Sequence, residues 1–265
     1  MRASLIQLSV DDPDSADERR RRAASLVRAR AGDDLVVLPE LWAAGAWAYD
    51  RWGHDAEGID GPTAEAMSAA AREAGVWLHA GSIVERDADG TLYNTALLFD
   101  RSGELRGLYR KIHRYGFDTG EATLMGGGDA VVTVPTELGV IGLAICYDLR
   151  FPELFRGLLD AGAELIAIPA AWPAARLTHW QLLTRTRALE EQVFLLACCA
   201  TGTHGGMRQN GHSVAVDPWG TVLGEAGTAE ETLTVDLDMG QVALMRSELP
   251  VLRDRVLAIE APRRR

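Results

Sequence analysis

The stretch Val140-Ile-Gly-Leu-Ala-Ile-Cys-Tyr-Asp-Leu-Arg-Phe-Pro-Glu-Leu154 carries the pattern that decides the fold. Residues 140–145 are a short apolar run with β-branched side chains, which predicts a buried strand. Pro152 predicts the first turn of a helix, where the missing N–H of proline costs nothing. Cys146 therefore lies at a strand-to-helix elbow. Such an elbow exposes the sulfur and directs backbone N–H groups, such as that of Tyr147, toward the atom that the sulfur attacks.

Two other apolar runs also stop at a charged residue. Residues 34–39 predict a strand that ends at Glu40, and residues 105–110 predict a strand that delivers Lys111. A carboxylate, an ammonium group and a thiol at strand ends are the groups that cysteine-dependent amide hydrolysis requires. The carboxylate takes the thiol proton, the cation stabilises the tetrahedral oxyanion, and the sulfur forms a thioester.

The order of these three motifs resembles that of the nitrilase, or carbon–nitrogen hydrolase, superfamily with its Glu-Lys-Cys triad. The motifs are Leu38-Pro-Glu-Leu-Trp42, Tyr109-Arg-Lys-Ile-His113 and the stretch around Cys146, and the resemblance continues through 168–172, 179–180, 185–190 and 211–220. It implies an α/β fold arranged as a four-layer α-β-β-α sandwich, a reaction without a cofactor, and assembly into a homodimer or a higher homo-oligomer. The residue pattern alone also permits a doubly wound α/β sheet.

The rest of the chain alternates between strand-like and helical patterns without a linker, so residues 1–265 are expected to form one carbon–nitrogen hydrolase domain. Strands are predicted at 3–9, 34–39, 76–84, 93–99, 105–110, 130–134, 140–145, 164–168, 193–199, 212–217, 221–225 and 231–236. Helices are predicted at 16–31, 62–74, 152–161, 177–191 and 239–246. Ser15 and Glu18 have the spacing of a capping box that opens the first helix.

Several residues are assigned roles beside the triad of Glu40, Lys111 and Cys146. Glu121 matches a second glutamate of the superfamily and is expected to orient Lys111 and the substrate amide. Trp172 and Arg150 are expected to bind the substrate. Further candidates for the pocket are Arg114, Arg176, Trp47 and Tyr49.

Composition excludes other classes of function. The net charge of −11 argues against a nucleic-acid partner. The basic clusters Arg19–Arg22 and Arg263–Arg265 are interpreted as a solvated helix face and a frayed tail. The sequence contains no apolar run long enough for a membrane span and no metal-ligand spacing. The odd count of three cysteines, Cys146, Cys198 and Cys199, predicts a reducing cytoplasm.

The sequence therefore predicts a cysteine hydrolase that releases ammonia from a small amide, similar to the ω-amidases that act on monoamides of short dicarboxylic acids. N-carbamoyl-amine hydrolase and nitrilase activity remain alternatives, as does a catalytically silent binding or regulatory member of the same fold. A thiol oxidoreductase would need a Cys-x-x-Cys pair, which is absent. The apolar segment with Leu154, Phe155, Leu158 and Leu159 is predicted to meet a second copy of the chain.

Overall fold

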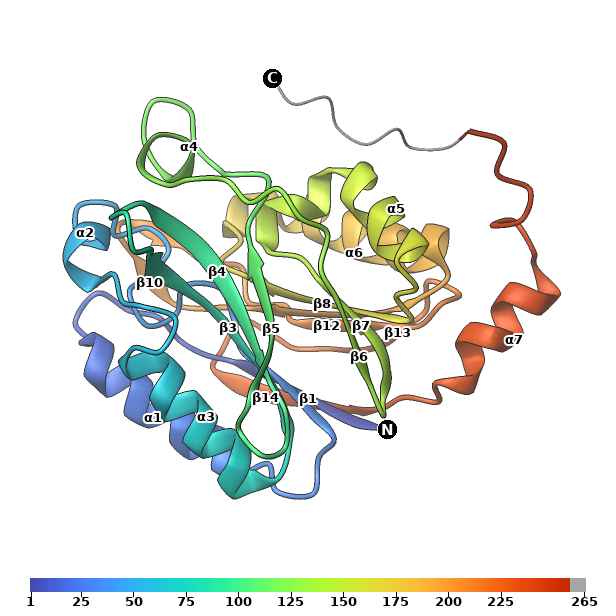
Figure 1. Ribbon diagram of the computed structural model, residues 1–265, viewed down its shortest axis with the longest axis horizontal. Helices are drawn as coiled ribbons and strands as arrows, with labels where there is room; N and C mark the ends of the chain where they lie inside the picture. The colour runs from blue at the N-terminus through green and yellow to red at the C-terminus, as the bar shows by residue number, and fades with distance from the viewer. Residues whose placement is uncertain (258–265) are drawn as a thin grey trace.

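Two six-stranded sheets lie between two pairs of helices in the computed structural model, which describes residues 1–257 (Figure 1). The first sheet has the strand order β14-β1-β2-β3-β4-β5, and the second has the order β13-β12-β9-β8-β7-β6. Helices α1 (Ala16–Arg28) and α3 (Pro62–Ala74) lie on one side, and α5 (Pro152–Asp160) and α6 (Leu177–Glu191) lie on the other. The fold is the four-layer sandwich, and a single doubly wound sheet is excluded.

The remaining elements have the following bounds. The first sheet contains β1 (Arg2–Gln7), β2 (Leu35–Val37), β3 (Trp77–Arg86), β4 (Leu92–Phe99), β5 (Leu105–Arg110) and β14 (Glu231–Asp236). The second contains β6 (Thr133–Thr136), β7 (Gly139–Leu143), β8 (Leu165–Ala170), β9 (Phe194–Cys199), β12 (Val214–Val216) and β13 (Val222–Glu225). Outside the sheets lie α2 (Trp52–Asp55), α4 (Glu121–Leu124), η1 (Cys146–Arg150), η2 (Ala174–Arg176), the hairpin of β10 (Thr203–His204) and β11 (Met207–Arg208), and α7 (Gly240–Glu248).

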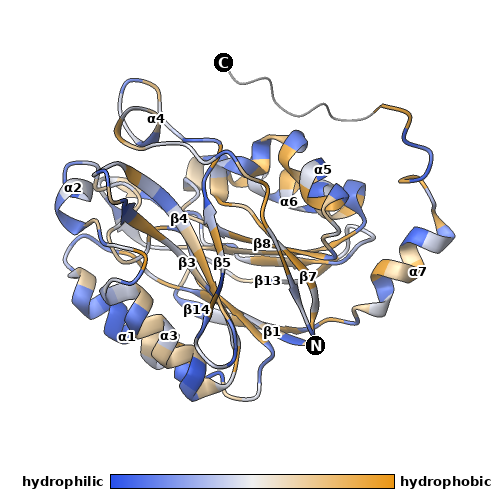
Figure 2. Ribbon diagram, viewed as in Figure 1, coloured by the Kyte–Doolittle hydropathy of each residue, from blue (hydrophilic) through white to orange (hydrophobic). Residues whose placement is uncertain are grey.

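The hydrophobic core explains why the central strands are apolar along their whole length. Strands β2, β8 and β9 are buried at every position, because each has one face toward the other sheet and one toward helices (Figure 2). Between the sheets, Leu5 packs in one cluster with Leu143 and Leu196. On the outer face of the first sheet, Val27 and Met67 of the two helices form a second cluster. The two sheets are therefore packed tightly against each other, so side chains at their strand ends can be held in place to form a site.

The predicted elements agree with the observed ones within a few residues at most ends. The capping box is present, since Glu18 N donates to Ser15 Oγ at 3.2 Å and Ser15 N donates to Glu18 Oε2 at 2.9 Å. Short elements such as α2, α4 and the β10–β11 hairpin were not predicted, because two to four residues carry no measurable periodicity.

Two predictions about surfaces are wrong. Leu154, Phe155 and Leu158 are buried inside the core of their own chain, so these three side chains cannot meet a second copy. Leu159 is half-buried, and its contact with a second copy stays a prediction. Arg19 is also buried, because its guanidinium donates to the carbonyl oxygens of Asp11, Asp14 and Ala43 instead of facing solvent. The predicted tail at Arg263–Arg265 lies outside the described residues.

Candidate active site

The ends of three strands bring Glu40, Lys111 and Cys146 together. Glu40 follows β2 and Lys111 follows β5 in the first sheet, whereas Cys146 follows β7 in the second. All three residues line one cleft, and their exposed fractions are 3%, 2% and 8%. The cleft offers about 440 Å³ of space, counting the part open to solvent, which suits a small molecule.

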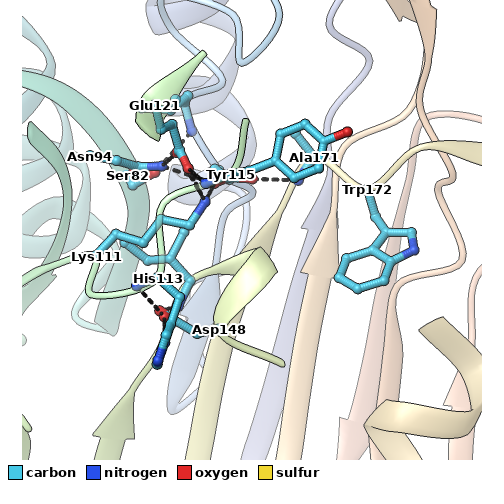
Figure 3. A network of polar contacts seen from close by, with 12 residues as sticks. Ser82, Asn94, Lys111, His113, Tyr115, Glu121, Asp148, Ala171 and Trp172 are labelled. Carbon is cyan, nitrogen blue, oxygen red and sulfur yellow. Dashed lines mark hydrogen bonds and ion pairs between the residues drawn. The ribbon is translucent and has the colours of Figure 1, made fainter. Parts of the chain in front are cut away.

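Lys111 forms the centre of the polar network (Figure 3). Its Nζ donates to Glu40 Oε1 at 2.6 Å and to Glu121 Oε1 at 2.9 Å, so one ammonium group joins two buried carboxylates. The second oxygen of Glu40 accepts from the backbone N–H of Ala171 at 2.9 Å, and the second oxygen of Glu121 accepts from that of Tyr115 at 2.7 Å. The side chain expected to orient Lys111 is therefore in contact with it.

Asn94 of β4 is a member of this network that sequence reasoning missed. Its Nδ2 donates to Glu40 Oε1 at 2.9 Å and to Glu121 Oε1 at 2.5 Å, and its backbone carbonyl oxygen accepts from the backbone N–H of Lys111 at 2.9 Å. The available signal was an asparagine inside the otherwise apolar run 93–99. A buried amide in a strand requires partners, and here the partners are the two carboxylates.

The choice of lysine at position 111 is a second signal in the sequence. Lys111 is the only lysine of the chain, and every other member of the 27 lysine and arginine residues is an arginine. An arginine is planar and forked, whereas an ammonium group is a compact donor that fits among three acceptors. A chain that uses arginine everywhere else therefore has a lysine where the geometry calls for a point charge.

Burial and charge shift the protonation of the network. Burial alone would lower the pKa of Lys111, but the charges of Glu121 and Glu40 outweigh it and raise that pKa well above its usual value. Burial also raises the pKa of Glu121, against the opposing effect of Lys111. Burial, with the adjacent charge of Glu40, raises the pKa of the Cys146 thiol well above its usual value. The resting cysteine is thus a neutral thiol, and it lines the same cleft as the carboxylate of Glu40.

The backbone at the candidate nucleophile is unusual. Cys146 has a φ of +43° and is the first residue of η1, so the chain turns sharply between β7 and the 3₁₀ helix. Leu41, which follows Glu40, has a φ of +44°. Non-glycine residues in this region are strained, and such strain gathers at functional sites. The elbow predicted from the sequence is present, with Tyr147 as its second residue.

Aromatic rings and two arginines form the walls of the cleft. Trp172 and Arg150 line it as predicted, and so do Trp47 and Tyr49. The guanidinium of Arg150 lies 4.7 Å from the ring centre of Trp172 and 3.3 Å from His179 Nδ1.

The second arginine of the wall is Arg176. Its Nη1 donates to the hydroxyl of Tyr115 at 3.2 Å. Across residues 1–257, neither Arg150 nor Arg176 forms an ion pair with a carboxylate. Arg114 does not line the cleft, because its guanidinium donates to the carbonyl oxygens of Ala122 and Met125. The prediction that Arg114 belongs to the pocket is therefore wrong.

The other cysteines and possible metal ligands lie apart from this chemistry. Cys198 and Cys199 are fully buried in β9, and the sulfur of Cys199 accepts from the backbone N–H of Trp172 at 3.3 Å. Among residues 1–257, no group of three or more His, Cys, Asp or Glu side chains is placed to hold a metal ion. No helix in the same range has the length and apolarity needed to cross a membrane.

Comparison with known proteins identifies the family to which this site belongs. The family described as Carbon-nitrogen hydrolase matches residues 2–247. The chain belongs to the carbon–nitrogen hydrolase family. This hydrolase is 40% identical to 2-oxoglutaramate amidase of Paenarthrobacter nicotinovorans over 259 residues, which cover 95% of the chain and 88% of the relative.

Two further relatives agree in sequence and in structure. Omega-amidase NIT2 of Mus musculus is 37% identical over 96% of this chain and 94% of its own. The crystal structure of Nit3 from Saccharomyces cerevisiae, a member of branch 10 of the nitrilase superfamily, has a TM-score of 0.89, 29% identity and 97% coverage of both chains. The protein is a hydrolase that acts on non-peptide carbon–nitrogen bonds of small amides.

Proposed function

We propose that this carbon–nitrogen hydrolase is a cysteine amidase with Cys146 as nucleophile, and that it removes ammonia from monoamides of short dicarboxylic acids. The observation that carries the proposal is the position of Lys111. Its ammonium group is held between Glu40 and Glu121, in the same cleft as the Cys146 thiol. A fixed cation and a carboxylate base next to a sulfur match the needs of acyl transfer.

The first half of the reaction forms a thioester. Glu40 takes the proton of the Cys146 thiol as the sulfur attacks the amide carbon, so no free thiolate has to persist in a cluster that already contains two carboxylates and one ammonium group. Lys111 and the backbone N–H of Tyr147 stabilise the oxyanion. When the tetrahedral intermediate collapses, Glu40 returns the proton to the nitrogen, and ammonia leaves.

The second half hydrolyses the thioester. Glu40 removes a proton from a water molecule, whose oxygen attacks the thioester carbon, and Lys111 again stabilises the oxyanion. The carbon–sulfur bond breaks, the sulfur recovers its proton from Glu40, and the product is a carboxylic acid. Glu121 and Asn94 hold Lys111 and Glu40 in place throughout, and these residues need no cofactor for the reaction.

Arg150 and Arg176 support an anionic substrate. Both guanidinium groups line the cleft and have an imidazole nitrogen, a hydroxyl group or an aromatic ring as partner. A substrate carboxylate would supply the missing opposite charge, and the buried network would bind the amide at the other end. The names of the two amidase relatives given above agree with this assignment.

The proposed substrate class is tested by comparing the turnover of acidic amides with that of a neutral amide. A charge-assisted hydrogen bond contributes about 1.5–3 kcal/mol, so Arg150→Gln or Arg176→Gln should raise KM for 2-oxoglutaramate and succinamate roughly 10- to 100-fold. KM for butyramide, which has no carboxylate, should change less than about threefold. Arg114→Gln is the matched control, because that guanidinium binds only carbonyl oxygens. Equal effects on the acidic and neutral amides would overturn the assignment.

The nucleophile has its own test. Cys146→Ala should abolish ammonia release, and mass spectrometry with a slow substrate should find one acyl adduct, on Cys146. Cys198 and Cys199 serve as internal controls, since both are fully buried. Turnover by the alanine variant, or an adduct on another cysteine, would reject the mechanism.

The chain is further proposed to act as one domain over residues 1–265, in the cytoplasm and as a homodimer. Three free cysteines support the reducing compartment. A partner surface is offered by α6 and the nearby β12–β13 turn, where Leu182, Leu189 and Trp219 have exposed fractions of 62%, 47% and 39%. Light scattering that finds a monomer at micromolar concentration would reject the dimer.

A further inference from the structure

Asp148 is a charged side chain that the proposed reaction does not use. It lies in η1, two residues after the nucleophile, and is fully buried. Its Oδ2 accepts from Ile145 N at 2.9 Å and from Tyr109 Oη at 2.8 Å. Its Oδ1 accepts from His113 N at 3.0 Å and from His113 Nδ1 at 2.7 Å (Figure 3). Four donors therefore converge on one carboxylate, which accounts for its burial.

These donors belong to the two segments that carry the reacting groups. Tyr109 and His113 lie two residues before and two residues after Lys111, on the end of β5 in the first sheet. Ile145 precedes Cys146 and follows β7 in the second sheet. The hydrogen bonds of Asp148 thus join the sheets directly behind the site.

Two more contacts strengthen the same junction. The hydroxyl of Tyr109 accepts from Ile112 N at 3.2 Å, which ties down the residue next to Lys111. The ring of His113 stacks on that of Phe151, with 3.8 Å between the ring centres and 4° between the planes. Phe151 directly follows η1, so both ends of this short helix are connected to the segment around Lys111.

We propose that Asp148 is a positioning residue that fixes the strand end carrying Lys111 relative to the elbow carrying Cys146. The inference rests on the proposed roles of those two residues. Lys111 and Cys146 come from different sheets, so their separation depends on the contacts between the sheets. A misplacement of about 1 Å between an oxyanion donor and a nucleophile lowers turnover about 100-fold. Asp148 is the carboxylate that joins the two segments at this point.

Asparagine has the same shape as aspartate, but it cannot replace Asp148. Each carboxylate oxygen accepts from one backbone N–H, that of Ile145 on one side and that of His113 on the other. A backbone N–H cannot become an acceptor. Whichever way the amide of Asp148→Asn is turned, its NH₂ group therefore faces a donor, and one of the two segments is released.

The proposal is tested by measuring turnover per folded active site. The folded fraction of each protein is first measured by circular dichroism, so that turnover is expressed per folded active site and unfolded protein does not count. In Asp148→Asn, kcat for succinamate should fall about 100-fold while KM stays within about threefold. A loss of fold alone would lower the number of folded sites and leave kcat per site unchanged.

The single lysine provides a direct spectroscopic readout. Protein grown with ¹³C-lysine gives one set of lysine signals, which belongs to Lys111. The Cε signal should shift in Asp148→Asn. The matched control is Asp100→Asn, which weakens the turn before β5, where Asp100 accepts from Ser102 N at 2.8 Å and Glu104 N at 3.0 Å. This control should leave both the Lys111 signal and kcat per site unchanged.

Milder variants keep the proposal testable if Asp148→Asn does not fold. Tyr109→Phe removes one donor, and His113→Phe removes another while retaining a ring to stack on Phe151. Each should lower kcat per site about five- to tenfold. Values within twofold of wild type for both variants, or for Asp148→Asn, would overturn the inference. Failure of the proposed function is recognised separately, because Cys146→Ala would then remain active in the same assay.

Discussion

Replacement of the single lysine by methionine should make the protein unstable in a pH-dependent way. Lys111 is 2% exposed and lies within 2.9 Å of Glu40 Oε1 and of Glu121 Oε1. Lys111→Met leaves the two carboxylates buried together without a cation. Removal of one partner from a buried ion pair costs about 3–5 kcal/mol. For a chain of this size, that corresponds to a decrease in Tm of roughly 6–20 °C near neutral pH.

The direction of the pH effect follows from the pKa of Glu121. Burial already raises this pKa, and the charge of Lys111 opposes the increase, so the methionine variant should raise it further. A carboxyl group whose folded pKa lies above its unfolded pKa loses stability as the pH rises between the two values. The Tm difference between wild type and Lys111→Met should therefore be small near pH 4 and grow toward pH 8.

Thermal unfolding followed by circular dichroism at pH 4, 6 and 8 measures this difference. A second variant, in which Lys111→Met is combined with Glu40→Gln and Glu121→Gln, removes the like charges and should lose most of the pH dependence. A decrease in Tm below about 2 °C at pH 8, or one that is the same at pH 4 and pH 8, would refute the electrostatic account of the site.

Three other predictions concern the elbow, the helices and a buried carboxyl group. Cys146→Gly should be more stable than Cys146→Ala by about 1 kcal/mol in free energy of unfolding, and so have the higher Tm, because glycine accepts a φ of +43° without strain. A lower Tm for the glycine variant would contradict this. Leu158→Glu should give insoluble protein because Leu158 is buried, whereas Leu182→Glu should stay folded and shift light scattering toward the monomer; a folded Leu158→Glu variant would be inconsistent with the packing of α5. Burial raises the pKa of Glu191 to about 7, so its charged form is unfavourable and stability is lost as the pH rises toward and through 7. Glu191→Gln should therefore gain stability relative to wild type as the pH rises from 5 to 7, with little further change above 7, in urea unfolding; the same difference at pH 5 and pH 7 would refute this.

Local patterns were sufficient to predict most elements and the three motifs of the site. A strand such as residues 105–110 is recognisable from its own side chains, and Pro152 or Ser15 marks a helix start through contacts within one turn. These signals depend on neighbours a few residues away. The positions of Glu40, Lys111 and Cys146 at strand ends were therefore visible without tertiary structure.

Contacts between distant segments could not be derived in the same way. Asn94 lies 54 residues from Glu40, and its role depends on β4 pairing with β5 so that the amide meets both carboxylates. The face of α5 with Leu158 is apolar whether it packs against its own sheet or against another chain, and only the packed structure distinguishes the two.

The sequence by itself determined which chemistry is proposed, because the proposed nucleophile, base and cation each follow a recognisable strand. Tertiary structure decided how those groups are held and what surrounds them. The partners of Lys111, the placement of Arg150 and Arg176 in the cleft wall, and the position of the Asp148 carboxylate between the sheets all depend on which strands lie side by side. The partners that a long side chain meets depend on how the two sheets pack against each other. A local sequence pattern does not encode that packing.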